Sequence, residues 1–178
     1  MHILLTNDDG YQAAGIQTLY RTLQAQTKHR ISIVAPDSQR SATGHSITLY
    51  HPLFFSEYPL EGGEKGYAVS GTPSDCVKLA VQGELVPRPD LVISGINQGS
   101  NLGTDVFYSG TVSAAMEGVI LGIPSLAVSL AGCEFVDFEP AARYLAENLE
   151  QIVPGRQRGL LNINFPGIPK ESWQGIKV

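Results

Sequence analysis

The sequence is short of cysteine, of charge and of long apolar runs, and each shortage excludes a class of protein. Two of its 178 residues are cysteines, Cys76 and Cys133, too few for a disulfide framework, so we expect a reducing, cytoplasmic location. No apolar run approaches the ~20 residues of a membrane-spanning helix, and no signal peptide is recognisable, so we expect no membrane partner. Charged residues make up 16% of the chain, and a formal net charge of −5 disfavours binding to nucleic-acid polymers.

Several catalytic motifs are absent as well. Neither the phosphate-loop pattern G-x-x-x-x-G-K-[ST] nor the hydrolase elbow G-x-S-x-G occurs. The segment GINQGSNLG departs from the G-x-G-x-x-G spacing of dinucleotide-binding folds. Asp8 is followed two positions later by Gly10, unlike the D-x-D pattern of phosphatases of the haloacid dehalogenase type. The sequence therefore disfavours these enzyme classes.

What is present predicts one α/β domain over residues 1–178, because apolar residues make up 43% of the chain and the length allows a substantial core. Strand-like apolar runs alternate with stretches of helical periodicity. This order is typical of a Rossmann-like, doubly wound, mainly parallel sheet with helices on both faces. The expected strands are the run before Asp8 and residues 30–35, 90–94, 125–130 and 160–165. The expected helices are residues 15–26 and 139–152 and those that begin after Thr72 and Ser109.

Residues 47–70 interrupt this alternation. We expect strands at residues 47–55 and 67–70, joined across a glycine-rich turn as an inserted β-hairpin. Thr72 then caps the following helix, which places Cys76 in the core rather than in a reactive site.

The first strand ends in two adjacent carboxylates, Asp8 and Asp9, followed by Gly10. Neighbouring side chains of an extended chain point to opposite faces, so the two converge only if the backbone turns, which Gly10 permits. At ~5 Å and an effective dielectric constant of ~20, their repulsion is about 3 kcal/mol, or roughly two pKa units. A divalent cation that prefers oxygen ligands, such as Mg²⁺, Mn²⁺ or Ca²⁺, would turn this repulsion into binding. The alternative interpretation is a polar Asx-type turn with a glycine exit.

Three polar segments follow strands of the expected sheet, at residues 7–10, 37–46 and 95–103. In a doubly wound sheet all three lie at the edge where ligands bind. The second segment would add a neutral oxygen to the metal site from Ser41 or Thr43. The third segment would add one from Asn97 or Asn101. His2, His29 and His51 lack the spacing of metal ligands, and for His45, which lies in the same loop as Ser41, we expect a surface position or a supporting role.

The stretch Ser109-Gly110-Thr111 opens a helix and is a candidate phosphate site. Helix N-termini expose unpaired backbone N–H groups and carry about half a positive charge. A capping hydroxyl, a residue that allows close backbone approach and a second hydroxyl together favour phosphate binding there. The alternative is an ordinary serine cap.

Six motifs, taken together, closely resemble the stationary-phase survival protein (SurE) family of metal-dependent nucleotidases: ILLTNDDG, VAPDSQRSATGHSIT, SGTPSDC, SGINQGSNLG, YSGTVSAAMEG and NINFP. The resemblance covers essentially the whole chain. It implies one divalent cation per subunit, Mg²⁺, Mn²⁺ or Ca²⁺, with these ligands: Asp8, Asp9, Ser41 and Asn97. It also implies a phosphate site lined by Asn101, Ser109, Gly110 and Thr111.

The activity implied by the resemblance is hydrolysis of nucleoside 5′- and 3′-monophosphates, and also of short polyphosphate. In this interpretation Asp8 and Asp9 are catalytic, and a water activated by the metal attacks phosphorus. The resemblance also implies a homodimer or homotetramer, although the family's C-terminal oligomerisation extension is not present in these residues. The alternative function is a non-catalytic module that binds nucleotide or phosphate. The carboxylate pair distinguishes the two, because a simple anion-binding site would not place two carboxylates beside its ligand.

Overall fold

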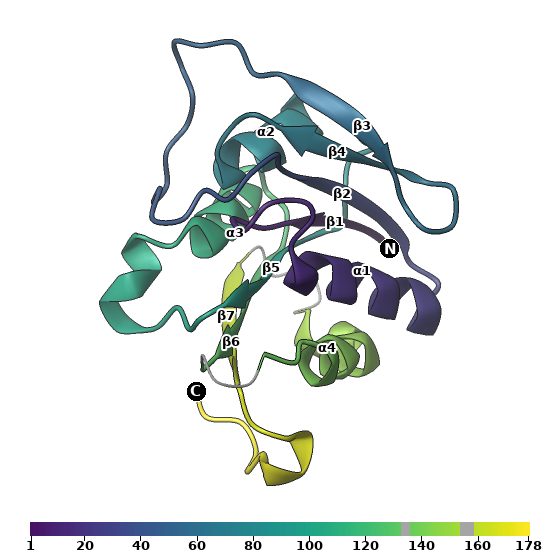
Figure 1. Cartoon of the computed structure of the whole chain (residues 1–178), viewed down its shortest axis with the longest axis vertical. Coiled ribbons are helices and arrows are strands. Elements are labelled where there is room, and N and C mark those ends of the chain that lie inside the picture. Colours follow the sequence, from purple (N-terminus) through teal and green to yellow (C-terminus); the bar gives the residue numbers. More distant parts are fainter. Residues whose placement is uncertain (133–135, 154–158) are drawn as a thin grey trace.

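The structure is a computed structural model of the chain, and it describes residues 1–132, 136–153 and 159–178 (Figure 1). Within these ranges a seven-stranded sheet has the strand order β3-β4-β2-β1-β5-β6-β7. The predicted α/β class is confirmed. In chain order the elements are β1 (His2–Thr6), α1 (Ala14–Gln26), β2 (Arg30–Pro36), β3 (Phe55–Pro59), β4 (Lys65–Val69), α2 (Pro73–Gln82), β5 (Leu91–Gln98), η1 (Gly103–Phe107), α3 (Gly110–Ile120), β6 (Ser125–Ala131), α4 (Glu139–Ile152), β7 (Leu160–Pro166) and η2 (Lys170–Ser172).

The sheet is parallel except for the β3–β4 hairpin, and β1 lies at its centre between β2 and β5. The helices α1 and α4 pack together on one face, and α2 and α3 pack together on the other. Because strands of the same direction end at the same edge, the loops after β1, β2 and β5 are neighbours. Of the helices in the described part of the chain, none is both long and apolar enough to cross a membrane.

Local sequence explains where the helices form. On α1 the apolar residues at helical spacing are all buried against the sheet: Ile16, Leu19, Tyr20 and Leu23. On α2 the predicted start is confirmed, because Thr72 Oγ1 accepts from the backbone N–H of Asp75 and the Asp75 carboxylate accepts from that of Thr72. This cap provides hydrogen-bond partners for backbone N–H groups that the start of a helix leaves unpaired.

The inserted hairpin is also confirmed, but its first strand was wrongly placed: it covers Phe55–Pro59 and shares only Phe55 with the predicted residues 47–55. Residues 47–54 are not a strand, and β3 begins only at Phe55. The reason is a set of contacts that sequence periodicity does not report: Thr48 donates from its backbone N–H and its hydroxyl to Asp75, and Thr72 Oγ1 donates to Ser46 O. The segment that contains Ser46 and Thr48 is therefore hydrogen-bonded to the start of α2 and does not pair with β4.

The cysteine prediction holds for the residue that the structure describes. Cys76 is fully buried between α2 and the sheet, and burial raises the pKa of its thiol, which makes the thiolate scarce. Cys133 lies outside the described residues.

The contact between the start of α1 and β5 leaves no room for a side chain at Gly15. A Cβ atom added there would lie 1.9 Å from the carbonyl oxygen of Ile96. Gly15→Ala should therefore lower the free energy of unfolding by about 2 kcal/mol, although alanine is ordinarily the better helix residue. Urea denaturation measures this change. Arg21→Ala, at an exposed position of the same helix, is the control and should change stability by less than about 0.5 kcal/mol. An equally stable Gly15→Ala protein would contradict the tight contact.

Candidate functional site

The loop after β1 turns sharply, as the sequence requires for the two carboxylates to converge. Gly10 has a φ of +98°, and the amide nitrogen Nδ2 of Asn7 donates to the carbonyl oxygen of Gly10 over 2.9 Å. Asp8 is buried, with 6% of its surface exposed, and Asp9 is half-buried. Their charges are close enough for Asp9 to raise the pKa of Asp8.

The loop after β2 lies directly against this turn. The backbone N–H of Arg40 donates to the carbonyl oxygen of Asp8 over 2.7 Å. Ser41 follows immediately, is exposed, and accepts a hydrogen bond from Gln39 Nε2 over 2.9 Å. The Thr43 hydroxyl instead donates to the carbonyl oxygen of Arg40 over 3.1 Å. Of the two candidates in this loop, Ser41 therefore has the more accessible oxygen.

The end of β5 brings the third predicted segment to the same place, because the strand continues to Gln98 where the sequence predicted a loop from residue 95. The backbone N–H of Gln98 faces the Asp9 carboxylate and lowers its pKa. The neighbouring Asn97 donates through Nδ2 to the carbonyl oxygen of Gly99 over 2.8 Å. Because its NH₂ group is turned toward Gly99, the amide oxygen of Asn97 is available as an acceptor or ligand.

Asn101, the other candidate in this segment, is held mainly by the neighbouring strands β6 and β7. Its Nδ2 donates to Ser129 Oγ over 2.8 Å, and its backbone N–H donates to Asn164 Oδ1 over 2.8 Å. Its carbonyl oxygen accepts from Asn162 and Asn164. Asn101 is buried, so these bonds fix its orientation.

Ser129, Asn162 and Asn164 were missed as site residues from the sequence. The available signal was the spacing within NINFP, where two asparagines separated by one residue lie on the same side of a strand. That pattern predicts a polar stripe on β7, but not which loop the stripe contacts.

The start of α3 touches the carboxylate pair. Ser109 Oγ accepts from the backbone N–H of Val112 over 3.1 Å, which confirms the predicted cap. A Cβ atom added to Gly110 would lie 2.7 Å from the Cβ of Asp8, so the helix start is pressed against that side chain. The hydroxyl of Thr111 donates to Asp8 Oδ1 over 2.5 Å. Gly110 and Thr111 therefore hold Asp8, a contact that the sequence did not indicate.

The pKa of Asp8 is raised to about 6. The first cause is burial, which penalises the charged carboxylate, and the charge of Asp9 adds a smaller effect in the same direction, while the Thr111 hydroxyl lowers the pKa. Burial also raises the pKa of Asp9. The sequence argument assigned such a shift to repulsion between the two carboxylates, but desolvation is the larger cause.

A sequence profile of the family described as Survival protein SurE matches residues 3–178 of this chain. The chain belongs to the SurE family. It is 63% identical over 178 residues to a protein of Desulfitobacterium hafniense (strain DSM 10664 / DCB-2) named 5′-nucleotidase SurE, an alignment that covers 100% of this chain and 69% of the relative. It is 53% identical over 182 residues to the protein of the same name from Synechococcus elongatus, covering 100% of this chain and 70% of that one. The crystal structure of the SurE protein from Aquifex aeolicus superposes with a TM-score of 0.84 at 41% identity, covering 99% of this chain and 71% of that one.

The donor set of this SurE family chain fits a hard divalent cation. In the described part of the chain, no three His, Cys, Asp or Glu side chains form a group that could hold a metal. The charged ligands would therefore be Asp8 and Asp9 alone, and neutral oxygens would complete the shell, as is usual for Mg²⁺, Mn²⁺ and Ca²⁺. A cation beside Asp8 would also offset the desolvation that raises its pKa.

His45 does not contact the carboxylate pair. Its Nε2 lies 2.9 Å from Glu117 Oε2, on the part of α3 about two turns beyond Gly110. The expectation of a supporting position rather than a ligand position agrees with this contact.

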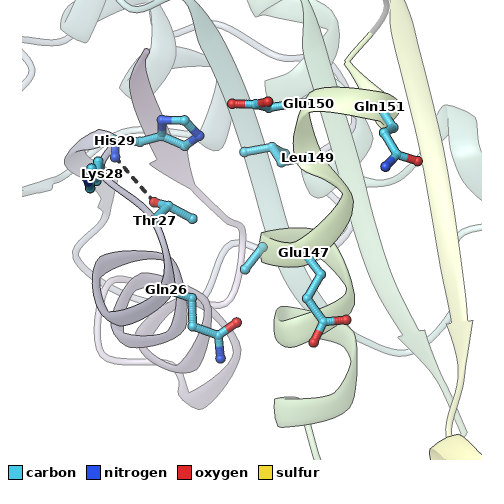
Figure 2. A pocket seen from close by; sticks show the side chains of 9 residues that line it. Gln26, Thr27, Lys28, His29, Glu147, Leu149, Glu150 and Gln151 are labelled. Atoms are coloured by element: carbon cyan, nitrogen blue, oxygen red, sulfur yellow. Dashed lines mark hydrogen bonds between the residues drawn. The ribbon is translucent and has the colours of Figure 1, made fainter.

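A cavity of about 370 Å³ lies at the opposite edge of the sheet, between the ends of α1 and α4 (Figure 2). Figure 2 shows side chains from the end of α1, among them Thr27 and His29, on one side and Glu147 and Glu150 of α4 on the other. His29 Nδ1 lies 3.4 Å from the amino group of Met1, which places this cavity at the amino ends of the strands. It is therefore separate from the candidate site at their carboxyl ends.

The raised pKa of Asp8 predicts how the stability of the metal-free protein depends on pH. Its folded-state value of about 6 exceeds the ordinary 3.8, so folding favours the protonated form and the stability contributed by Asp8 is lost as the pH rises through about 6. Asparagine resembles the protonated acid, so Asp8→Asn without metal should be more stable than the parent by roughly 2 to 3 kcal/mol at pH 8. The difference should vanish below about pH 4. Urea denaturation across this pH range measures it.

The exposed Asp105 provides the control, because Asp105→Asn at pH 8 should change stability by less than about 0.5 kcal/mol. Added Mn²⁺ should stabilise the parent and not the Asp8→Asn protein. An Asp8→Asn protein that is less stable than the parent at pH 8 without metal would contradict the desolvation argument.

Proposed function

We propose that this chain hydrolyses nucleoside 5′-monophosphates to nucleoside and phosphate with a divalent cation bound at Asp8 and Asp9. The observation that carries the proposal is the contact of Gly110 and Thr111, at the start of α3, with the buried side chain of Asp8, which is followed directly by Asp9. A positive helix terminus and a cation-binding carboxylate pair then face the same point. The family membership and the name 5′-nucleotidase SurE of relatives at up to 63% identity support the same reaction.

The proposed metal ligands are Asp8, Asp9, Ser41 and Asn97. The first two supply the charge, and the others supply neutral oxygens from the loops after β2 and β5. Thr111 assists by donating to Asp8, which favours the charged form that a metal requires. A cation bound there would neutralise phosphate charge and lower the pKa of a coordinated water.

The proposed phosphate site is the start of α3 together with Asn101. Of the backbone N–H groups of the first turn, that of Val112 is bonded to Ser109 Oγ and that of Thr111 faces Asp8, so the N–H of Gly110 is the one that can donate to a phosphoryl oxygen. Ser109 uses its oxygen to cap Val112, so its hydroxyl proton is available for a phosphate oxygen. Nucleoside 3′-monophosphates and short polyphosphates present the same terminal phosphate, and we propose them as further substrates.

We further propose that the chain acts as a homodimer or homotetramer. Large apolar side chains are exposed in the segments that follow the Ser41 loop and precede α3, which supports an interface there: Leu49, Tyr50, Phe54, Leu102, Phe107 and Tyr108. Each subunit has the candidate site within its own chain.

The second candidate function is a non-catalytic phosphate-binding module. It is favoured only by the helix terminus, which by itself suits any anion. Two carboxylates next to that terminus, Asp8 buried and Asp9 half-buried, would repel phosphate in the absence of a cation. Such a module would therefore need a metal to bind phosphate, and Asp9 would have no function in it. Turnover of substrate decides between the two.

Removal of metal gives the direct test of the proposed reaction. With a nucleoside 5′-monophosphate as substrate, we expect EDTA to abolish phosphate release and Mn²⁺ or Mg²⁺ to restore it. Asp9→Asn should lower kcat/KM by at least ~100-fold, because half of the anionic ligand set is lost, and Asp105→Asn should not. Full activity in the presence of the chelator would refute the metal assignment, and tight phosphate binding without turnover would support the module.

We also expect water to attack phosphorus directly, without a phosphoserine intermediate. Ser109 is a helix cap, Ser41 is assigned to the metal, and the one histidine in the nearby loop, His45, is bound to Glu117 rather than to either serine. Ser109→Ala should therefore slow hydrolysis by roughly 10-fold and not abolish it. Transfer of phosphate to added methanol, measured with two monophosphates of different leaving groups, should give different transfer ratios. A constant ratio with phosphoserine in quenched enzyme would contradict direct attack.

A further inference from the structure

Glu117 is a buried carboxylate outside the proposed metal and phosphate site. It lies on α3 with 1% of its surface exposed, in a helix whose other buried residues are uncharged. Its Oε2 lies 2.9 Å from His45 Nε2, and its Oε1 lies 3.6 Å from Lys78 Nζ. Burial of a carboxylate is unfavourable unless it is paired, so a glutamate at this position requires a reason beyond packing.

His45, its closest partner, belongs to the loop that holds Ser41. Ser41 is exposed, and within the described ranges its side chain is bonded only to Gln39, two residues earlier in the same loop. Its position relative to Asp8 therefore depends on how the loop as a whole is held, and not on packing around its own side chain.

The backbone conformation of the Ser41 loop is unfavourable by itself and is stabilised by contacts with other segments. Ala42 has a φ of +55°, in the left-handed region that is unfavourable by about 1 kcal/mol or more for a residue with a side chain. The backbone N–H of Arg40 is bonded to Asp8 before this residue, and that of Gly44 is bonded to Tyr108 after it, over 3.1 Å. The contact of the His45 side chain with Glu117 adds a further attachment next to Gly44.

Helix α3 connects the contact between His45 and Glu117 to the proposed metal site. Glu117 and Gly110 lie on the same helix, about two turns or roughly 10 Å apart. The start of α3 is pressed against Asp8, and its later part binds His45. One helix therefore sets both the position of a proposed metal-binding carboxylate and that of the loop with Ser41.

We propose that His45 and Glu117 are positioning residues that hold the Ser41 loop so that Ser41 completes the cation site. This inference rests on the proposed function, because it takes Ser41 as a ligand. It predicts that replacing either residue of the pair weakens metal binding. If the pair served only to neutralise Glu117, the same replacements would lower stability alone. Lys78 remains beside Glu117 when His45 is replaced, so the carboxylate keeps a positive partner.

Calorimetric titration with Mn²⁺, without nucleotide, measures the predicted effect. His45→Gln and Glu117→Gln should each weaken Mn²⁺ binding by ~10-fold, the lower end of the effect of removing groups that support metal ligands. The double variant should be no weaker than either single one, because both changes remove the same attachment. At saturating Mn²⁺, KM for a nucleoside 5′-monophosphate should stay within about 2-fold of the parent, since α3 still presents the phosphate site.

His51→Gln is the matched control, because His51 is an exposed histidine six positions along the chain that makes no side-chain hydrogen bond within the described ranges. Its Mn²⁺ affinity and unfolding midpoint should equal those of the parent. If His45→Gln and Glu117→Gln lower the unfolding midpoint but bind Mn²⁺ like the parent, the pair is structural only and the inference is wrong. Additive losses in the double variant would also overturn it.

The same experiment separates this inference from the proposed function. A parent protein that binds no Mn²⁺ would refute the metal site and, with it, the role of the pair. A parent that binds Mn²⁺ but releases no phosphate would refute the activity, while the titrations of the variants would still decide whether the pair positions the loop.

Discussion

The structure around the candidate site depends on the burial of one carboxylate. Asp8 is nearly inaccessible, and burial raises its pKa to about 6, so its charge needs support from the groups that contact it. Thr111 donates to it, and Gly110 has no side chain that would displace it. This single requirement explains why a glycine and a threonine lie at the start of α3, and it joins two segments that are 103 positions apart in the chain.

The sheet makes this convergence possible. With β1 at the centre, the loop after it has the loop after β2 on one side and that after β5 on the other. Each neighbour contacts the turn through a backbone group: the N–H of Arg40 donates to the backbone carbonyl oxygen of Asp8, and the N–H of Gln98 faces the Asp9 carboxylate. Backbone groups do not vary with the side chain, so the arrangement of the loops is maintained by topology, whereas the chemistry of the site is set by a few side chains such as Ser41 and Asn97.

The sequence predicted those features that arise from local pattern. Apolar periodicity and caps predicted the helices, the alternation of elements predicted a parallel sheet, and the sheet-edge rule placed three polar segments together. It did not predict contacts that depend on the exact packing of distant elements. Residues 47–54 were predicted to be part of a strand, because apolar periodicity does not report the bonds of Thr48 to Asp75 or that of the preceding Ser46 to Thr72. The hydrogen bonds that β7 makes to Asn101 are likewise visible only in the three-dimensional structure. The same is true of the finding that burial, more than the charge of Asp9, raises the pKa of Asp8.

The central place of β1 has a consequence for the order in which the molecule folds. β1 pairs with β5, whose residues come more than 80 positions later in the chain, as in the pairing of Ile3 with Leu91. The contacts of Asn101 with β7 add separations of 61 and 63 positions. Long loops must close before such contacts form, so β1 can pair with β2 early while its other edge stays open until β5 is made. During synthesis that open edge is the part of the chain most exposed to wrong pairing, and the site is completed among the last events of folding.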